Sequence, residues 1–314
     1  PAAQHDRYAM SVCSDPKGNV WAMFNSDTLG RVEAGTMEQQ FWQSPELPHS
    51  FRALLDDQAG SLWMGTGDGR LYRRRDGKFT FELQVCQTPD YVSALFKDSK
   101  SNLWVGFTGG AGVGFMPQSD PKQWRVLEGL SFPDVRCIAE GADGAMWFGT
   151  HYGGVFSWQE GRWKRFSTRD GLPSDYVRSL RADPDGTIWL ATITGLCRWR
   201  DGKFTSITTA QGLWHDSLSH IADDGHGNFW LSSFGGVFRV ARQQLNEFAE
   251  GRRSLIQCIG YGRNEGLPAQ ECPGGFQPAG AMTADGRLWF PTVDGLISIA
   301  PQSVPENTLP PPVW

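Results

Sequence analysis

The chain has 314 residues, and its composition excludes several classes of protein before any motif is considered. Glycine (38) and proline (19) together make 57 of 314 residues, about 18% against a usual share near 12%, and there are 14 tryptophans. A glycine costs a helix interior about 1 kcal/mol and a proline about 3, so this punctuation favours short strands and turns. With 39% hydrophobic and 12% aromatic residues, the chain can bury a large core, which argues against disorder.

The charge balance argues against nucleic acid as a partner. There are 29 basic and 34 acidic residues, and the longest basic run is Arg73-Arg74-Arg75, so no basic stripe is available for phosphates. No apolar run approaches the roughly 18 residues of a membrane span, so membrane attachment is expected only through a full-length protein. Residue 1 is a proline without a signal peptide, which predicts a processed or excised piece.

A phrase of the form Asp-x-x-Gly-x-apolar-Trp recurs seven times, with one or two departures in some copies. Its tryptophans are separated by 42, 41, 43, 42, 41 and 59 residues, so only the last spacing is irregular. The seven repeat tryptophans are Trp21, Trp63, Trp104, Trp147, Trp189, Trp230 and Trp289.

Each repeat predicts four strands, most clearly in the fifth copy. There, extended segments are expected over 177–180, 187–192, 196–200 and 203–207, with turns at Asp185-Gly186, Thr194-Gly195 and Asp201-Gly202. About 42 residues in four antiparallel strands are typical of a β-propeller blade. The sequence therefore predicts an all-β, seven-bladed β-propeller over residues 1–300.

The repeat tryptophans are expected in the core and not in a ligand site. Two positions after most of them stands a small residue, as at Gly65, Gly106 and Gly149, on the same strand face as the indole. A large ring beside a small residue allows neighbouring twisted sheets to interdigitate.

The longer sixth spacing predicts one short helical insertion before the last blade. The segment 241–250 lacks glycine and proline, places Leu245 and Phe248 three residues apart, and is followed by Gly251. Cys258 and Cys272 lie farther along the same insertion, and a disulfide between them and two free buried thiols both remain open.

The C-terminal part predicts a Pro-rich linker and an incomplete last blade. Residues 301–314 contain five prolines and read as an extended linker. Blade seven lacks an evident fourth strand, because Ile297–Ala300 meets Pro301 directly. Either Pro1–Tyr8 closes the ring, or the outer strand lies outside this chain.

The repeat resembles the two-component regulator propeller repeat, in which the tryptophan is followed by apolar-Gly-Thr-x-x-Gly-Leu. The matching phrases are Trp63–Thr66, Trp147–Thr150, Trp189–Leu196 and the linker phrase Asp170–Pro173. The departures are Ser101 for glycine, Gly141 and Thr283 for aspartate, and Met23 for glycine.

This resemblance implies a periplasmic sensor domain of a membrane-anchored bacterial regulator, which passes a signal to a histidine kinase, a diguanylate cyclase or a similar output. Carbohydrates are frequent ligands in part of the family. Glu265–Pro268, Asp294–Leu296 and Pro310–Pro312 look like the last blade before the immunoglobulin-like domain that follows these propellers, so a missing downstream domain is an expected partner.

The sequence offers no catalytic motif, metal spacing or cofactor fingerprint. No C-x-x-C pair occurs, and the spacing of His215, His220 and His226 suits no metal site. Streptogramin lyases are propellers with a similar Gly-x-Leu-Trp-Phe phrase, but their catalytic Glu-x-His is absent here. A non-catalytic domain is therefore expected; a protein-interaction scaffold and a lyase-like enzyme are the alternatives.

The start of the inner strands supplies the first candidate ligand-binding residues. Arg52, Arg136 and Arg178 occupy equivalent positions in blades two, four and five, and Tyr91 and Tyr176 stand two positions before that place in their own blades. Guanidinium groups pair with carboxylate or sulfate, and aromatic rings stack on sugars. The alternative is that the arginines pair with neighbouring carboxylates, Asp134 and Asp175.

Two loop pairs complete the candidate set, His151-Tyr152 and Trp214-His215. Trp214 lies outside the repeat positions, so it either binds a ligand or caps a gap between blades. Together these residues predict a site for a carbohydrate or another small anionic or polar ligand on one face of the ring.

Overall fold

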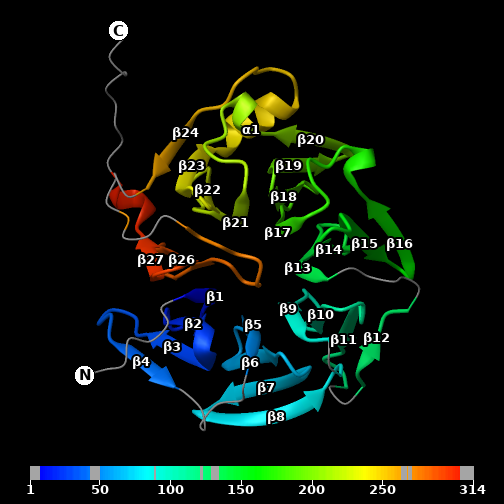
Figure 1. Cartoon of the computed structure of the whole chain (residues 1–314), viewed down its shortest axis with the longest axis vertical. Helices are drawn as coiled ribbons and strands as arrows, with labels where there is room; N and C mark the ends of the chain where they lie inside the picture. The colour runs from blue at the N-terminus through cyan, green and yellow to red at the C-terminus, as the bar shows by residue number, and fades with distance from the viewer. Residues whose placement is uncertain are drawn as a thin grey trace.

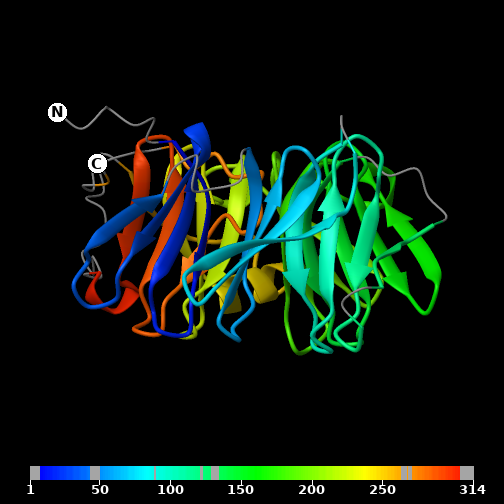
Figure 2. The same ribbon diagram turned by 90° about the horizontal axis from the view of Figure 1, so that it is seen from below.

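Seven antiparallel sheets surround a common centre in the computed structural model, which describes residues 8–42, 50–87, 90–120, 123–128, 134–262, 267 and 271–304. Figure 1 shows the sheets as blades of a ring, and Figure 2 shows the ring from the side as a flat disc. Within the described residues, six sheets have four strands and the last has three. The predicted seven-bladed β-propeller is confirmed.

The strands of each blade pair in chain order from the centre outward. Blade one contains β1 (Ala9–Ser14), β2 (Val20–Phe24), β3 (Thr28–Val32) and β4 (Gln39–Trp42), and blade two contains β5 (Phe51–Asp56), β6 (Ser61–Thr66), β7 (Arg70–Arg75) and β8 (Lys78–Gln84). Blade three contains β9 (Val92–Lys97), β10 (Leu103–Phe107), β11 (Val113–Met116) and β12 (Arg125–Val126), and blade four contains β13 (Val135–Glu140), β14 (Met146–Thr150), β15 (Val155–Gln159) and β16 (Arg162–Phe166). Blade five contains β17 (Val177–Ala182), β18 (Ile188–Thr192), β19 (Gly195–Arg200) and β20 (Lys203–Ile207), and blade six contains β21 (Leu218–Asp223), β22 (Asn228–Ser233), β23 (Gly236–Ala241) and β24 (Cys258–Tyr261). Blade seven contains β25 (Ala281–Met282), β26 (Leu288–Thr292) and β27 (Gly295–Ile299).

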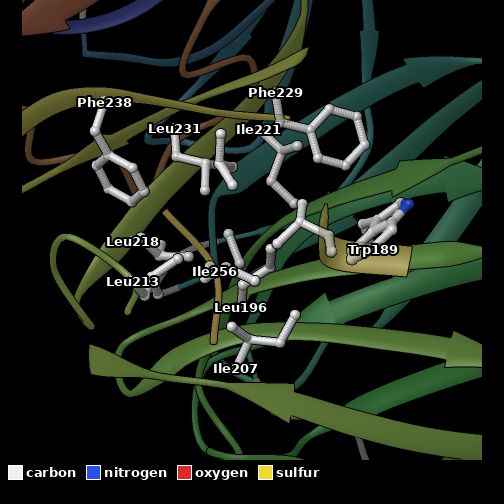
Figure 3. Close-up of a cluster of buried hydrophobic side chains, with 13 residues drawn as sticks. Trp189, Leu196, Ile207, Leu213, Leu218, Ile221, Phe229, Leu231, Phe238 and Ile256 are labelled. Carbon is white, nitrogen blue, oxygen red and sulfur yellow. The ribbon is translucent and has the colours of Figure 1, made fainter. Parts of the chain in front are cut away.

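The core lies between neighbouring blades. One cluster joins Trp189, Leu196 and Ile207 of blade five to Phe229 and Phe238 of blade six, and all of these side chains are buried (Figure 3). Each blade thus covers the apolar face of the next, which is why a single repeat could not stay folded alone. The predicted core role of the repeat tryptophans is confirmed, because all seven are at most 9% exposed.

The small residues that follow the tryptophans make room for the next blade. A Cβ atom at Gly65 would lie 2.2 Å from Cγ1 of Val92, the first residue of the neighbouring inner strand. The same relation joins Gly106 to Val135, at 2.6 Å. Glycine is therefore required at this position because the next sheet approaches closely, and not because a turn needs its backbone conformation.

The aspartate of the repeat ties its turn to its tryptophan. In blade three, Oδ1 of Asp98 accepts hydrogen bonds from the amides of Lys100 (3.0 Å) and Asn102 (2.7 Å), while Oδ2 accepts one from Nε1 of Trp104 (2.8 Å). The same indole bond joins Asp15 to Trp21, Asp183 to Trp189 and Asp224 to Trp230, at 2.8–3.1 Å. One carboxylate thus satisfies two turn amides and a buried indole N–H.

Blades four and seven show what happens where the aspartate is replaced. Thr283 stands at this position in blade seven, and Nε1 of Trp289 is buried without a hydrogen-bond partner among the described residues. Gly141 stands there in blade four, and Nε1 of Trp147 likewise makes no hydrogen bond to a described residue. The turns themselves persist in both blades, through bonds such as Gly144 N to Gly141 O at 2.9 Å.

The insertion before blade seven contains the predicted helix, α1 (Arg242–Ala249), with Leu245 buried and Phe248 packed against the core of blades five and six. After it, β24 supplies the outer strand of blade six. Cys258 and Cys272 are both free thiols, so the disulfide alternative is wrong. Burial raises the pKa of Cys258 to about 11 and that of Cys272 to about 12, which keeps both thiols protonated at neutral pH.

The ring closes through the inner strand of blade one. Val12 forms a parallel bridge with Ala279, its amide donates to the carbonyl of Pro278 (3.0 Å), and Ser14 Oγ donates to the carbonyl of Met282 (2.9 Å). Residues 1–7 and 305–314 lie outside the described residues, so the origin of a fourth strand for blade seven and most of the Pro-rich segment stay predictions. Pro301–Ser303 forms a 3-10 turn in which Pro301 is buried.

The hydrogen bonds that the repeat aspartate accepts from its turn and its tryptophan, here called the aspartate clamp, yield a stability prediction. Replacing Asp98 by alanine should lower the free energy of unfolding by about 2–4 kcal/mol, because the buried indole N–H of Trp104 and two turn amides lose their acceptor. Chemical denaturation followed by tryptophan fluorescence measures the loss. Lys100→Ala in the same turn, an exposed side chain, should change stability by less than about 0.5 kcal/mol, and equal effects of both changes would contradict the role of the clamp.

Candidate functional site

The predicted arginines stand at β-bulges of the inner strands. Register shifts in the first strand pair of the blades bracket Arg52 (between Phe51 and Ala53), Arg136 and Arg178. A bulge places one extra residue in a strand and redirects its side chain away from the regular alternation. The inner strands of these three blades can therefore keep their flanking residues in the core while each arginine points elsewhere.

Arg136 joins three groups at the inner edge of blade four. Its guanidinium lies 3.3 Å from Oδ2 of Asp134, donates to the carbonyl of Gly275 at 3.3 Å, and lies 3.4 Å from Nδ1 of His151. The side chain is 11% exposed, so these contacts are largely shielded from solvent. Arg136 therefore pairs with Asp134, as expected if the arginines pair with neighbouring carboxylates.

His151 is the centre of an aromatic stack beside Arg136. Its ring centroid lies 3.9 Å from that of Tyr152 and 4.2 Å from that of Tyr176. Tyr152 is 70% exposed and has a positive φ of 67°, an unusual conformation for a bulky residue. Burial first, and then the positive charge of Arg136, lower the pKa of His151, so its imidazole is neutral at pH 7.

Arg178 lies between two aromatic rings. Its guanidinium carbon is 4.9 Å from the ring centroids of both Tyr176 and Phe234, and Nη1 donates to Oγ of Ser217 at 3.2 Å. No carboxylate among the described residues forms an ion pair with it. The predicted alternative partner, Asp175, instead accepts a hydrogen bond from the amide of Thr168 at 2.7 Å. Arg178 thus keeps a positive charge available for an anionic group.

The structure therefore brings five of the predicted residues together into what we call the aromatic–arginine rim. Its members share the inner edges of blades four and five: Arg136, His151, Tyr152, Tyr176 and Arg178.

The other four predicted residues make no hydrogen bond, ion pair or ring contact with the five rim residues in the part of the chain that the structure describes. Arg52 forms a separate pair with Tyr91, whose ring centroid is 5.9 Å from the guanidinium carbon. Trp214 covers β24 of blade six: a Cβ atom at Gly260 would lie 2.3 Å from the indole ring. Its neighbour, His215, packs against Gly235, and its Nδ1 accepts a hydrogen bond from the amide of Ser217, the residue whose Oγ Arg178 binds.

A segment between blades six and seven crosses the centre of the ring. Residues 271–280, here called the plug, follow β24 and reach the middle of the propeller before β25 begins (Figure 1). At its start, the carbonyl of Cys272 accepts a hydrogen bond from Ser219 in blade six. At its end, the carbonyl of Pro278 accepts hydrogen bonds from Ser11 and Val12 in blade one.

The middle of the plug is bonded to blades two and four. Gln277 uses its side chain like a strand partner: Oε1 accepts from the amide of Ile138 and Nε2 donates to the carbonyl of the same residue, both at 2.9 Å. The backbone carbonyl of Gln277 accepts from the amide of Leu54 at 3.5 Å, and Phe276 packs against the core of blades one and two. The plug therefore spans the ring and fixes inner strands that are not neighbours.

Two glycines let the plug pass close to the inner strands. Gly274 has a φ of 56°, and a Cβ atom there would lie 2.6 Å from that of Ser219. Gly275 has a φ of 93°, and its carbonyl is the one that Arg136 binds. The plug thus forms one wall of the aromatic–arginine rim. The irregular spacing of 59 residues and the Gly-Gly pair were the only sequence signals for it.

The rim combines charged and aromatic groups. It offers two guanidinium groups, one of them without a carboxylate partner among the described residues, next to a neutral imidazole and an exposed phenol ring. Among the described residues no group of histidine, cysteine, aspartate and glutamate could hold a metal ion. The described helices include none that is long and apolar enough to cross a membrane.

Two segments of the chain match a known family of repeats. Residues 129–152 and 171–194 match the family model of the two component regulator propeller. The fold is similar to that of the extracellular domain of the hybrid two component system BT3049 from B. thetaiotaomicron, with a TM-score of 0.76, 22% identity, and coverage of 95% of this chain and 39% of that one. The chain thus spans about two fifths of the length of that extracellular domain. No curated protein sequence matches the chain.

Two other solved propellers share the fold at lower identity. A streptogramin B lyase matches with a TM-score of 0.73 and 15% identity, covering 94% of this chain and 93% of that one. The YCF48 protein, solved with a D1 peptide, matches with a TM-score of 0.65 and 11% identity, covering 93% and 91%. At these identities the likeness concerns the fold alone.

The plug yields a second prediction. Gln277→Ala should lower the free energy of unfolding by about 1–3 kcal/mol, because the amide and carbonyl of Ile138 lose their partners in the centre of the ring. Denaturation curves and hydrogen exchange at the amide of Ile138 measure the effect. Gln243→Ala, on the exposed face of α1, is the control. Unchanged exchange at Ile138 would contradict the anchoring role of the plug.

His220 predicts a pH dependence. Its Nδ1 lies 3.2 Å from Oγ of Ser179, and burial, followed by the charge of Arg181, lowers the pKa of His220 to about 4. The folded protein therefore favours the neutral imidazole, and its contribution to stability is complete above about pH 6.5 and is lost as the pH falls toward 4.

The matched variant is His220→Gln, which cannot titrate. The difference in unfolding free energy between wild type and variant should shrink by about 2–3 kcal/mol between pH 7 and pH 4. Urea denaturation at a series of pH values measures this difference. A constant difference over that range would show that His220 keeps its ordinary pKa.

Proposed function

We propose that this two component regulator propeller domain is a non-catalytic, ligand-sensing domain of a membrane-anchored bacterial signal-transduction regulator, located in the periplasm. Its ligand is a carbohydrate or another small anionic or polar molecule, bound at the aromatic–arginine rim. The observation that carries the proposal is Arg178, which lies between Tyr176 and Phe234 without a carboxylate partner among the described residues.

The location rests on the similarity to an extracellular sensor domain and on the matched repeats. A histidine kinase, a diguanylate cyclase or a similar output, together with an immunoglobulin-like domain downstream, would complete such a regulator. We propose these further parts because the chain spans only part of the solved extracellular domain that it resembles.

The rim is arranged to recognise a carboxylate or sulfate attached to a ring. The guanidinium of Arg178 supplies a planar, permanently charged donor, and the exposed face of Tyr152 offers a stacking surface beside it. His151 is neutral and can donate or accept a hydrogen bond without adding charge. The same groups leave no nucleophile paired with a base, which favours binding over turnover.

Signal transfer follows from the position of the plug. A ligand that takes a hydrogen bond from Arg136 would compete with the carbonyl of Gly275 and with Asp134. The plug bonds in turn to blades one, two and four. Binding would therefore bias how the rim and the plug sit together, and a downstream domain could respond to that change.

A protein-interaction scaffold and a lyase-like enzyme remain the alternatives. A scaffold would show no small-molecule binding even when its downstream domain is present. A lyase would consume a cyclic or uronic substrate, and the streptogramin B lyase shares the fold at 15% identity. Calorimetry with acidic and neutral oligosaccharides, followed by analysis of the recovered ligand for cleavage, separates the three functions.

Arg178→Ala tests the rim. For an acidic oligosaccharide that binds the wild type, the variant should bind at least about tenfold more weakly, a loss of about 1.4 kcal/mol or more, because a charge-assisted hydrogen bond is removed. Isothermal calorimetry gives the affinity, and a thermal melt checks that the variant is folded. Arg162→Ala, on the exposed outer strand β16, should leave affinity unchanged. Equal affinity of the Arg178 variant and the wild type would exclude the rim as the binding site.

A further inference from the structure

A groove on another part of the molecule has no role in the proposed function. It lies between blades four and five, has a volume of about 450 Å³, and is lined by the turns 141–143 and 184–186 and by Trp147, Trp199 and Asp201. The two turns are the Asp-x-x-Gly turns of their repeats, whereas the rim stands at the starts of the inner strands.

The groove exists where the repeat lacks its aspartate. In blades one, three, five and six, a carboxylate occupies this place and accepts a hydrogen bond from the tryptophan of the repeat. Blade four has Gly141 instead, and a Cβ atom built there would lie 3.2 Å from Nε1 of Trp147. The indole N–H thus points at the space that the missing side chain would fill.

One indole donor at this groove has no acceptor among the described residues. Trp147 is only 3% exposed, its Nε1 makes no hydrogen bond to a described residue, and this atom lies next to Gly141 in the lining of the groove. The ring of Trp199 packs against that of Trp147 with centroids 4.8 Å apart, but its own Nε1 is buried below the surface and is not reached from the groove. A donor without a protein acceptor favours a ligand that brings one, so Nε1 of Trp147 favours such a ligand here.

The charges around the groove select the rest of the ligand. Three carboxylates line it, and Arg200 neutralises two of them in part, at 2.8 Å from Asp185 and 3.6 Å from Asp201. Asp143 accepts a hydrogen bond from the amide of Ala145 and pairs with no cation among the described residues. The groove is therefore negative overall. This charge disfavours an anionic ligand, whereas the indole N–H of Trp147 favours a ligand with a neutral acceptor.

We propose that this groove binds a lysine-bearing peptide segment of a partner protein. A peptide carbonyl accepts from the indole N–H group of Trp147, and the lysine ammonium pairs with Asp143. A short peptide suits the volume, and it combines a neutral acceptor with a positive charge within a few ångströms. The inference does not depend on the ligand of the aromatic–arginine rim.

The test uses a blocked amino acid as the probe. N-acetyl-lysine N-methylamide is titrated into the whole chain up to about 50 mM, and the indole N–H signals are followed by two-dimensional NMR. The expected result is a saturating shift of the indole N–H signal of Trp147 with a dissociation constant in the millimolar range. The uncharged analogue N-acetyl-norleucine N-methylamide should bind at least about tenfold more weakly. Equal binding of both probes, or no shift at all, overturns the proposal.

Gly141→Asp provides the variant. Gly141 does not need a positive φ. A Cβ atom there would lie 2.8 Å from the carboxylate of Asp143, which can rotate away, and 3.2 Å from Nε1 of Trp147, to which the new carboxylate would bond as in other blades. The new carboxylate should shift one indole signal before any probe is added and abolish the response to the lysine probe. Thr283→Asp, the same change in blade seven, should leave the response intact. A response that survives Gly141→Asp overturns the proposal.

Asp143→Asn keeps the test decisive if the aspartate at 141 disturbs folding. Asp143 is exposed, and among the described residues its carboxylate accepts a hydrogen bond from the turn amide of Ala145, which an asparagine side chain can also do. The variant should reduce the affinity for the lysine probe at least about fivefold and leave the norleucine analogue unaffected. Unchanged affinity for the lysine probe shows that the ammonium is not recognised there, and the proposal fails.

Discussion

The carboxylate of the repeat aspartate is the interaction on which the propeller depends. One side chain holds the turn between two strands and also fixes the edge of a buried indole, so the position of the turn and the position of the core residue are set together. Because each tryptophan fills the interface with the next blade, this local bond determines how neighbouring sheets pack. The two blades without the aspartate keep their turns, but the indole N–H of each has no hydrogen-bond partner in the part of the chain that the structure describes.

A second constraint acts across the ring. Seven similar blades need contacts only with their neighbours, yet the plug bonds inner strands of blades one, two, four and six at once. It fills the centre with backbone and amide groups whose partners lie on strands far apart in the sequence. The rim where Arg136 meets the plug is therefore coupled to the whole ring, whereas the groove at Gly141 concerns only two blades.

The candidate site shows where sequence reasoning works and where it stops. Aligning the repeats placed Arg136 and Arg178 at equivalent positions, and the structure does bring them to the inner edges of adjacent blades with His151 and Tyr176 between them. Alignment of the repeats did not show that Arg52 and Trp214 have other partners than the rim residues. Arg52 pairs with Tyr91, and Trp214 covers β24. Phe234 and the plug were missed because their contacts join residues from different repeats, and such contacts leave no periodic pattern.

The sequence by itself determined the number of blades, the strands and turns within each, the helix before blade seven and the burial of seven tryptophans. These features depend on the spacing of residues and on local chemistry, and the same pattern occurs in all seven repeats. Only the tertiary structure decided the bulges that redirect the arginines, the free state of Cys258 and Cys272, the path of the plug and the groove left by Gly141. The reason is physical: each depends on distances between segments that are remote in the chain, and a repeat fixes the geometry inside a blade but not what irregular segments meet when the ring closes.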